Sequence, residues 1–82
     1  MVVIVFFIVN GKRYELSRED ILTAVDGVEP EPLRCHVVQV GPGVFPVKQV
    51  ISLATGIDRL DFTSMRARDV LRRLGFEPFR CA

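Results

Sequence analysis

An apolar segment followed by a two-residue turn signal places the strongest constraint on the fold of this chain. Val2 to Val9 is rich in β-branched and aromatic residues without polar alternation, which is typical of a strand covered on both faces. Asn10-Gly11 follows and favours a type I′ turn, because both central positions of that turn need positive φ. Lys12 to Leu16 is then predicted to be the second strand of a hairpin, with Tyr14 opposite Phe7.

The same apolar segment is too short to cross a membrane. It has eight residues, whereas a bilayer helix needs about 20, and Lys12 and Arg13 follow the segment instead of preceding it as in a signal peptide. The two cysteines, Cys35 and Cys81, are fewer than a secreted disulfide scaffold or a zinc site would use. We therefore expect reduced thiols, no metal, no membrane contact and a cytoplasmic location.

Three further segments carry helix signals. Ser17 can cap a first helix together with Asp20, a second helix is predicted from about Pro46 to Thr55, and a third from about Thr63 to Leu74. Glycines that can end the three helices are Gly27, Gly56 and Gly75. The apolar positions expected to face the core are Ile21, Leu22, Val25, Val28, Val47, Val50, Ile51, Ala54, Ala67, Val70, Leu71 and Leu74.

A second hairpin is predicted in the middle of the chain. Leu33 to Val40 reads as a strand, Gly41-Pro42-Gly43 as a turn, and Val44-Phe45 as a short partner strand. Glu29-Pro30-Glu31-Pro32 before it is expected to be an extended connector. The chain of 82 residues is therefore predicted to be a single α+β domain, residues 1–82, with a small, mainly antiparallel sheet from two hairpins packed against three helices.

Charge is distributed unevenly along the chain. Residues 1–33 hold three cations and six anions, whereas residues 34–82 hold eight cations and four anions, although the net charge is only +1. This asymmetry is expected of a chain that offers one face to an anionic partner, or of chains that associate end to end. Ordinary surface charge with chance clustering is the alternative.

The start of the second helix is one candidate anion site. Lys48 lies in the first turn, where the positive end of the helix dipole disfavours a cation but, together with free amides, favours a bound phosphate. Alternatively, Lys48 bends into solvent or pairs with Asp58 or Asp61.

The outward side of the third helix is the other candidate. It is predicted to carry several arginines around Met65, and Arg66 and Arg73 lie seven residues apart on one side. The second and third helices resemble a helix-turn-helix with an unusually long gap from Gly56 to Phe62. Arginines on a solvated helix also serve solubility alone. The residues predicted to contact phosphates are Lys48, Gln49, Arg59, Arg66, Arg68, Arg72 and Arg73.

Catalytic patterns are not apparent. His36, the sole histidine, is next to Cys35 in a predicted strand, where adjacent side chains point to opposite faces. Gly41-Pro42-Gly43 lacks the Gly-Lys-Ser/Thr that completes a phosphate loop. We expect no enzymatic activity, no cofactor and no small-molecule substrate.

Two family resemblances follow from these motifs. Val38 to Phe76 resembles a group of small uncharacterised bacterial proteins with no known activity, in which four motifs recur in this order. Here they are Phe45-Pro46-Val47-Lys48, Ala54-Thr55-Gly56, Asp61-Phe62-Thr63-Ser64 and Arg72-Arg73-Leu74-Gly75-Phe76. More distantly, the chain is similar to the N-terminal domain of modification-dependent HNH restriction endonucleases. That resemblance implies a DNA-binding module and nominates Lys48 and the polar side of the third helix, including Arg66 and Arg73.

The sequence therefore predicts a small, non-enzymatic nucleic-acid-binding protein, with DNA as the expected ligand. The alternative is a protein-interaction module or homodimer built on Val2 to Val9, because a long apolar strand can pair with its copy or lie at an interface. An antitoxin or inhibitor that buries its arginines on an acidic partner is a third possibility.

Overall fold

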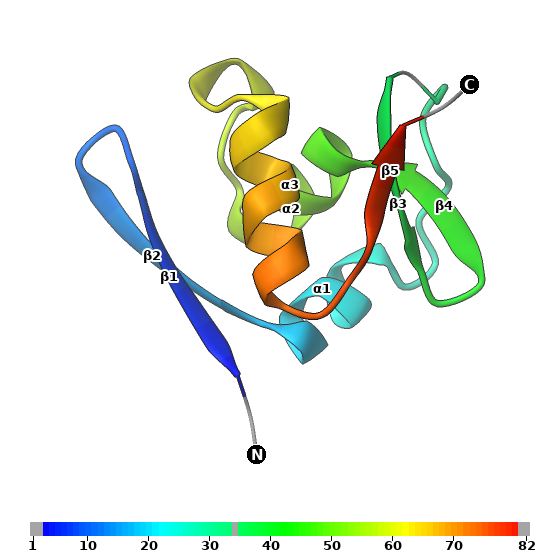
Figure 1. Cartoon of the computed structure of the whole chain (residues 1–82), viewed down its shortest axis with the longest axis horizontal. Helices are drawn as coiled ribbons and strands as arrows, with labels where there is room; N and C mark the ends of the chain where they lie inside the picture. The colour runs from blue at the N-terminus through cyan, green and yellow to red at the C-terminus, as the bar shows by residue number, and fades with distance from the viewer. Residues whose placement is uncertain (1–2, 34, 81–82) are drawn as a thin grey trace.

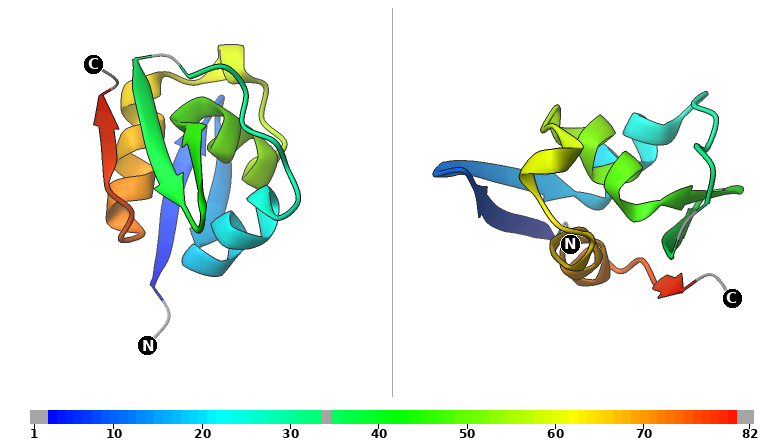
Figure 2. Two further views of the ribbon diagram at one scale, coloured as in Figure 1. Left: turned by 90° about the vertical axis from the view of Figure 1, so that its right-hand side faces the viewer. Right: turned by 90° about the horizontal axis from the view of Figure 1, so that it is seen from above.

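Two antiparallel sheets and three α-helices make up the described part of the chain, residues 3–33 and 35–80 of a computed structural model (Figure 1). In chain order the elements are β1 (Ile4–Val9), β2 (Lys12–Ser17), α1 (Arg18–Val25), β3 (His36–Val40), β4 (Gly43–Pro46), α2 (Val47–Thr55), the 3-10 helix η1 (Arg59–Asp61), α3 (Ser64–Arg73) and β5 (Pro78–Arg80). This arrangement confirms the α+β class. The two hairpins form separate sheets, because the helices lie between them (Figure 1, and Figure 2, right).

The β1–β2 hairpin has the predicted register and turn. Asn10 and Gly11 have φ of 52° and 76°, and Phe7 pairs with Tyr14 with ring centroids 5.7 Å apart. The prediction that β1 is covered on both faces is wrong. Its burial alternates, so that one face packs on the core while Ile4, Phe6 and Ile8 are exposed. A run without polar residues does not reveal which of its faces is left uncovered.

Helix α1 begins with the predicted capping box. The Ser17 hydroxyl accepts a hydrogen bond from the Asp20 amide at 3.3 Å, and the Asp20 carboxylate accepts one from the Ser17 amide at 2.9 Å. Ile21 and Val25 are buried as expected, whereas Leu22 is 39% exposed. Leu22 therefore lies at the edge of the core.

The second sheet has the order β4-β3-β5. Its central strand, β3, pairs with a strand on each side, and its residues Val37 and Val38, which point to opposite faces of the sheet, are both fully buried. Strand β5 was not predicted, because three residues are too few to show a period. Residue 34, in the segment where the sequence predicts the start of β3, lies outside the described residues.

Helices α2 and α3 supply much of the core. The hydrophobic core contains Val47, Val50 and Ile51 of α2. It also contains Val70 and Leu71 of α3. The segment between the two helices contains η1, so they are not joined by a short turn. No helix in the described part of the chain combines the length and apolar character that a bilayer crossing requires.

Candidate nucleic-acid interface

Helix α3 is fixed at both ends by local hydrogen bonds. The Thr63 side chain accepts a hydrogen bond from the Arg66 amide at 3.1 Å. At the other end, Gly75 adopts a φ of 90°, which lets the Phe76 amide bond back to the Leu71 carbonyl at 3.0 Å. The apolar side of α3 faces the core, so its remaining side chains are held outward on a rigid element.

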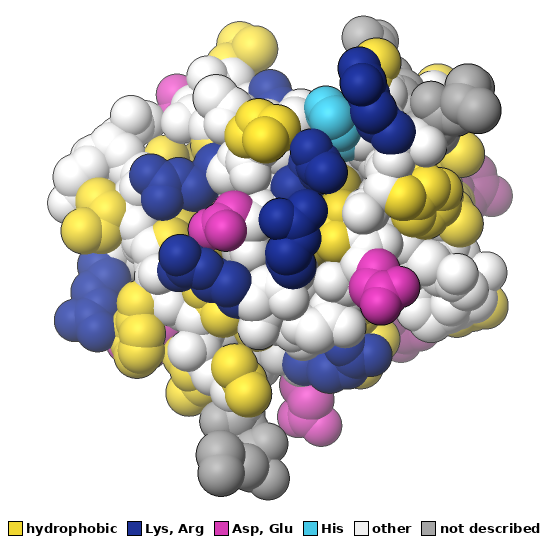
Figure 3. Space-filling model, in the orientation of Figure 1, with side chains coloured by type: hydrophobic (Ala, Val, Ile, Leu, Met, Phe, Trp, Pro, Cys, Tyr) yellow, Lys and Arg dark blue, Asp and Glu magenta, His cyan; other side chains and the backbone are white. Residues whose placement is uncertain are grey.

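Arginines occupy most of this outward side. The guanidinium groups of Arg66 and Arg72 form no hydrogen bond or ion pair with any residue that the structure describes. Arg73 lies 3.3 Å from the Asp69 carboxylate, but their side chains are 61% and 50% exposed, so the pair is weak. Figure 3 shows Lys and Arg side chains gathered over α3, with one carboxylate among them.

Arg68 is partly buried at the side of this surface. Its terminal Nη1 donates to the Met65 sulfur at 3.4 Å, which is a weak interaction. Its Nε is buried and has no hydrogen-bond partner in the part of the chain that the structure describes. A buried donor without an acceptor is costly, by about 1–3 kcal/mol, so an oxygen from water or from a ligand would be favourable there.

The structure adds Arg80 and His36 to this region. They are directly opposite each other in the β3–β5 pair, and their side chains therefore share a face of the sheet, beside α3. His36 Nδ1 is buried without a partner among the described residues, and Figure 3 shows the histidine with Lys or Arg side chains beside it. Sequence reasoning missed both residues because their proximity depends on β5.

Lys48 does not project freely from the start of α2. Its Nζ donates to the Arg59 carbonyl at 3.3 Å and lies 5.9 Å from the centroid of the Phe62 ring. It therefore neither extends into solvent nor pairs with Asp58 or Asp61. Pro46, the residue before α2, offers no side-chain cap, so the first amides of α2 receive no hydrogen bond from it.

Gln49 and Arg59 hold the connector between α1 and β3 in place. Gln49 is 3% exposed; its side chain donates to the Glu29 carbonyl at 3.1 Å and accepts from the Glu31 amide at 2.9 Å. Arg59 forms a two-pronged ion pair with the Glu31 carboxylate, and this hydrogen-bonded partner raises the pKa of Arg59. Both side chains are hydrogen-bonded within the protein, so they do not add to the arginines on the outward side of α3.

The described residues do not form a metal site. Among residues 3–33 and 35–80, no three His, Cys, Asp or Glu side chains are grouped so that they can hold an ion. Cys35 is an exposed free thiol, and Cys81 lies outside the described residues.

Comparisons with known proteins identify a family for this chain. The family model described as SCO5918-like matches residues 5–81, which is nearly the whole sequence. The chain matches no curated protein and no solved structure, and the comparisons give no link to HNH endonucleases. The chain thus belongs to the SCO5918-like family.

Proposed function

We propose that this protein binds nucleic acid through phosphate contacts on the outward side of α3. The proposed contact surface, which we call the α3 arginine surface, consists of Arg66, Arg68, Arg72, Arg73 and Arg80. The observation that carries the proposal is that the guanidinium groups of Arg66 and Arg72 and the buried Nε of Arg68 have no partner among the described residues.

The local charge supports this proposal. From Ser64 to Arg80 the chain holds five arginines and two carboxylates, although the whole chain is almost neutral. Guanidinium groups match phosphate geometry well, and they are displayed here on a helix whose ends are fixed. The resemblance to the N-terminal domain of HNH restriction endonucleases is the reason for choosing DNA as the first ligand to test.

Lys48, Gln49 and Arg59 are not part of the proposed surface. Each side chain is already hydrogen-bonded within the protein, which restrains it away from a phosphate-binding conformation.

Fluorescence anisotropy with a labelled DNA duplex, measured over a range of salt concentrations, tests the proposal. A surface that neutralises about four phosphates gives a slope near −3.6 in a plot of log K against log salt. Arg72→Ala should weaken binding. Arg13→Ala is the control, because it removes an exposed arginine side chain from β2, away from α3. Absence of binding at about 50 mM salt, or equal losses in the two variants, would refute the proposal.

A homodimer is the second candidate, and the uncovered face of β1 favours it. Ile4, Phe6 and Ile8 are 49%, 49% and 57% exposed and form an apolar row. Arg13 and Glu15 lie beside that row, opposite Ile8 and Phe6 on β2. In a symmetric dimer these two charges can pair reciprocally around a buried apolar centre.

Sedimentation over a range of concentrations tests the dimer separately from DNA binding. Phe6→Ser should shift the equilibrium toward monomer, whereas Leu53→Ser, which removes another partly exposed apolar side chain on α2, should not. A wild-type protein that stays monomeric up to about 0.5 mM would exclude the dimer while leaving the DNA proposal intact.

A further inference from the structure

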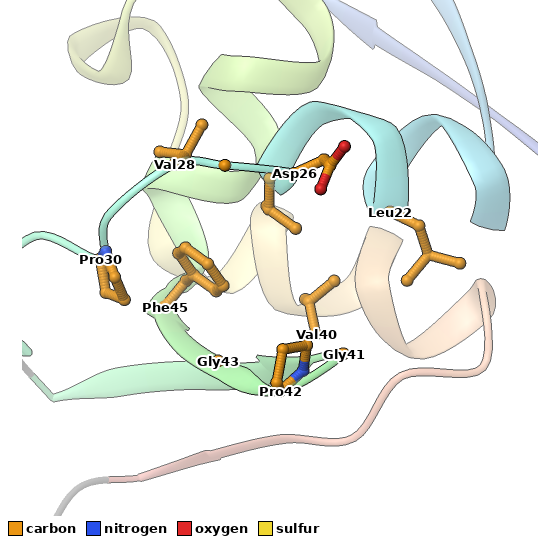
Figure 4. A pocket seen from close by; sticks show the side chains of 11 residues that line it. Leu22, Asp26, Val28, Pro30, Val40, Gly41, Pro42, Gly43 and Phe45 are labelled. Carbon is orange, nitrogen blue, oxygen red and sulfur yellow. The ribbon is translucent and has the colours of Figure 1, made fainter.

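A cavity of about 290 Å³ lies between the end of α1 and the β3–β4 hairpin. Figure 4 shows Leu22, Val40 and Phe45 around a common space, with Pro42 at its base. Its volume is near the lower limit of small-molecule sites, and apolar walls are typical of such sites. None of its lining residues belongs to α3 or β5, so the cavity is separate from the α3 arginine surface.

The charged and dipolar groups at the rim of this cavity are negative. Asp26, at its rim in Figure 4, is the one charged residue in the lining, and its carboxylate has no partner among the described residues. The last turn of α1 ends beside Asp26 and contains no basic residue that would balance the negative end of the helix dipole. The rim therefore favours a positive charge, while the walls favour an apolar group.

We propose that this cavity binds a small amphipathic cation, with an apolar body against Leu22, Val28 and Pro42, above a floor of buried Val40 and Phe45, and an ammonium group near Asp26. The body takes the apolar space and replaces water there. The ammonium gains from both the Asp26 carboxylate and the end of α1. Leu22 was expected to face the core, and its partial exposure is explained because it forms one wall of this site.

Three probes that share a phenyl ring and differ in charge test this inference. They are phenethylamine, 2-phenylethanol and 3-phenylpropanoate, titrated into the labelled full chain by amide NMR. Three of the six glycines line the cavity, namely Gly27, Gly41 and Gly43. Their amides should shift saturably with the amine, in the millimolar range. Gly11, Gly56 and Gly75 are the internal controls.

The amine should bind about fivefold more tightly than the carboxylate, because the interaction with a partly exposed carboxylate is modest. Asp26→Asn should weaken amine binding about two- to fivefold, whereas Asp61→Asn, which changes an exposed carboxylate on η1, should not. Leu22→Ser should weaken binding of all three probes about threefold. Leu53→Ser is its control, because Leu53 is similarly exposed at 41% but lies outside the cavity.

Equal affinity for the amine and the carboxylate would overturn the inference. So would shifts that do not saturate, or that are as large at the three control glycines. Retained amine affinity in both Asp26→Asn and Leu22→Ser would overturn it as well, provided that the amide spectra show both variants to be folded.

Discussion

Two cations, Lys48 at the start of α2 and Arg59 in η1, have surroundings opposite to those of the cations on α3. Lys48 and Arg59 are bonded within the protein, to a backbone carbonyl and to Glu31. On α3, the side chains of Arg66 and Arg72 have no partner among the described residues, and that of Arg73 has one weak partner. The difference teaches that a cation near a helix start indicates an anion site only when the rest of the fold leaves that cation free.

The partners of the Gln49 and Arg59 side chains come from the proline-containing connector, Glu29 to Pro32. This segment is 18 to 20 residues from Gln49 in sequence. Gln49 and Arg59 should therefore contribute to stability, and the α3 arginine surface to binding.

The largest effect is expected for Gln49→Ala. The substitution leaves the Glu31 amide and the Glu29 carbonyl without their partner and removes a buried side chain. We expect the free energy of unfolding to fall by about 2–3 kcal/mol, measured by urea denaturation. Gln39→Ala is a suitable control, because the Gln39 side chain is exposed and makes one long hydrogen bond. A loss below about 0.5 kcal/mol would show that the connector does not depend on Gln49.

The double substitution Arg66→Ala and Arg72→Ala should show the opposite behaviour. Both side chains are exposed and unpaired within the described residues, so stability should change by less than about 0.5 kcal/mol. Duplex affinity should fall about tenfold or more, and the salt slope should become less steep by about 1.8, because two phosphate contacts are lost. Anisotropy titrations at several salt concentrations give both values. Unchanged affinity and slope would remove these arginines from the interface.

Arg59→Ala should cost about 0.5–1 kcal/mol of stability without affecting duplex binding. The Arg59 and Glu31 side chains are 42% and 40% exposed, so solvent screening reduces the value of their ion pair. Glu31 raises the pKa of Arg59, so this stabilisation is fully present below the ordinary arginine pKa and is lost only above it. The cost should therefore be constant from about pH 7 to about pH 10. A cost that changes across this range would indicate another role for Arg59.

The smallest effect is expected for Asp69→Asn. It removes the carboxylate from the α3 arginine surface and releases Arg73, so duplex affinity should rise about twofold. Asp58→Asn, in the loop before η1, changes the net charge equally and is the control. If both variants bind equally well, net charge rather than the local pair determines affinity.

Local signals made much of the fold predictable. Asn10-Gly11 fixed the first hairpin, and Ser17 with Asp20 located the start of α1, because each interaction spans only a few residues. The role of Gln49 was not predictable, since it depends on a connector distant in sequence. The exposed face of β1 and the pairing of His36 with Arg80 likewise depend on which elements pack together.

The arginine side chains themselves give the most direct test of the central claim. Their Nε–Hε resonances can be followed by NMR while a DNA duplex is added. We predict that Arg66, Arg68 and Arg72 shift together and that Arg59 does not move. Arg68 Nε should change most, because it is buried and no described residue supplies an acceptor for it. Shifts confined to Arg59 and the start of α2, or no shifts at about 50 mM salt, would contradict the account.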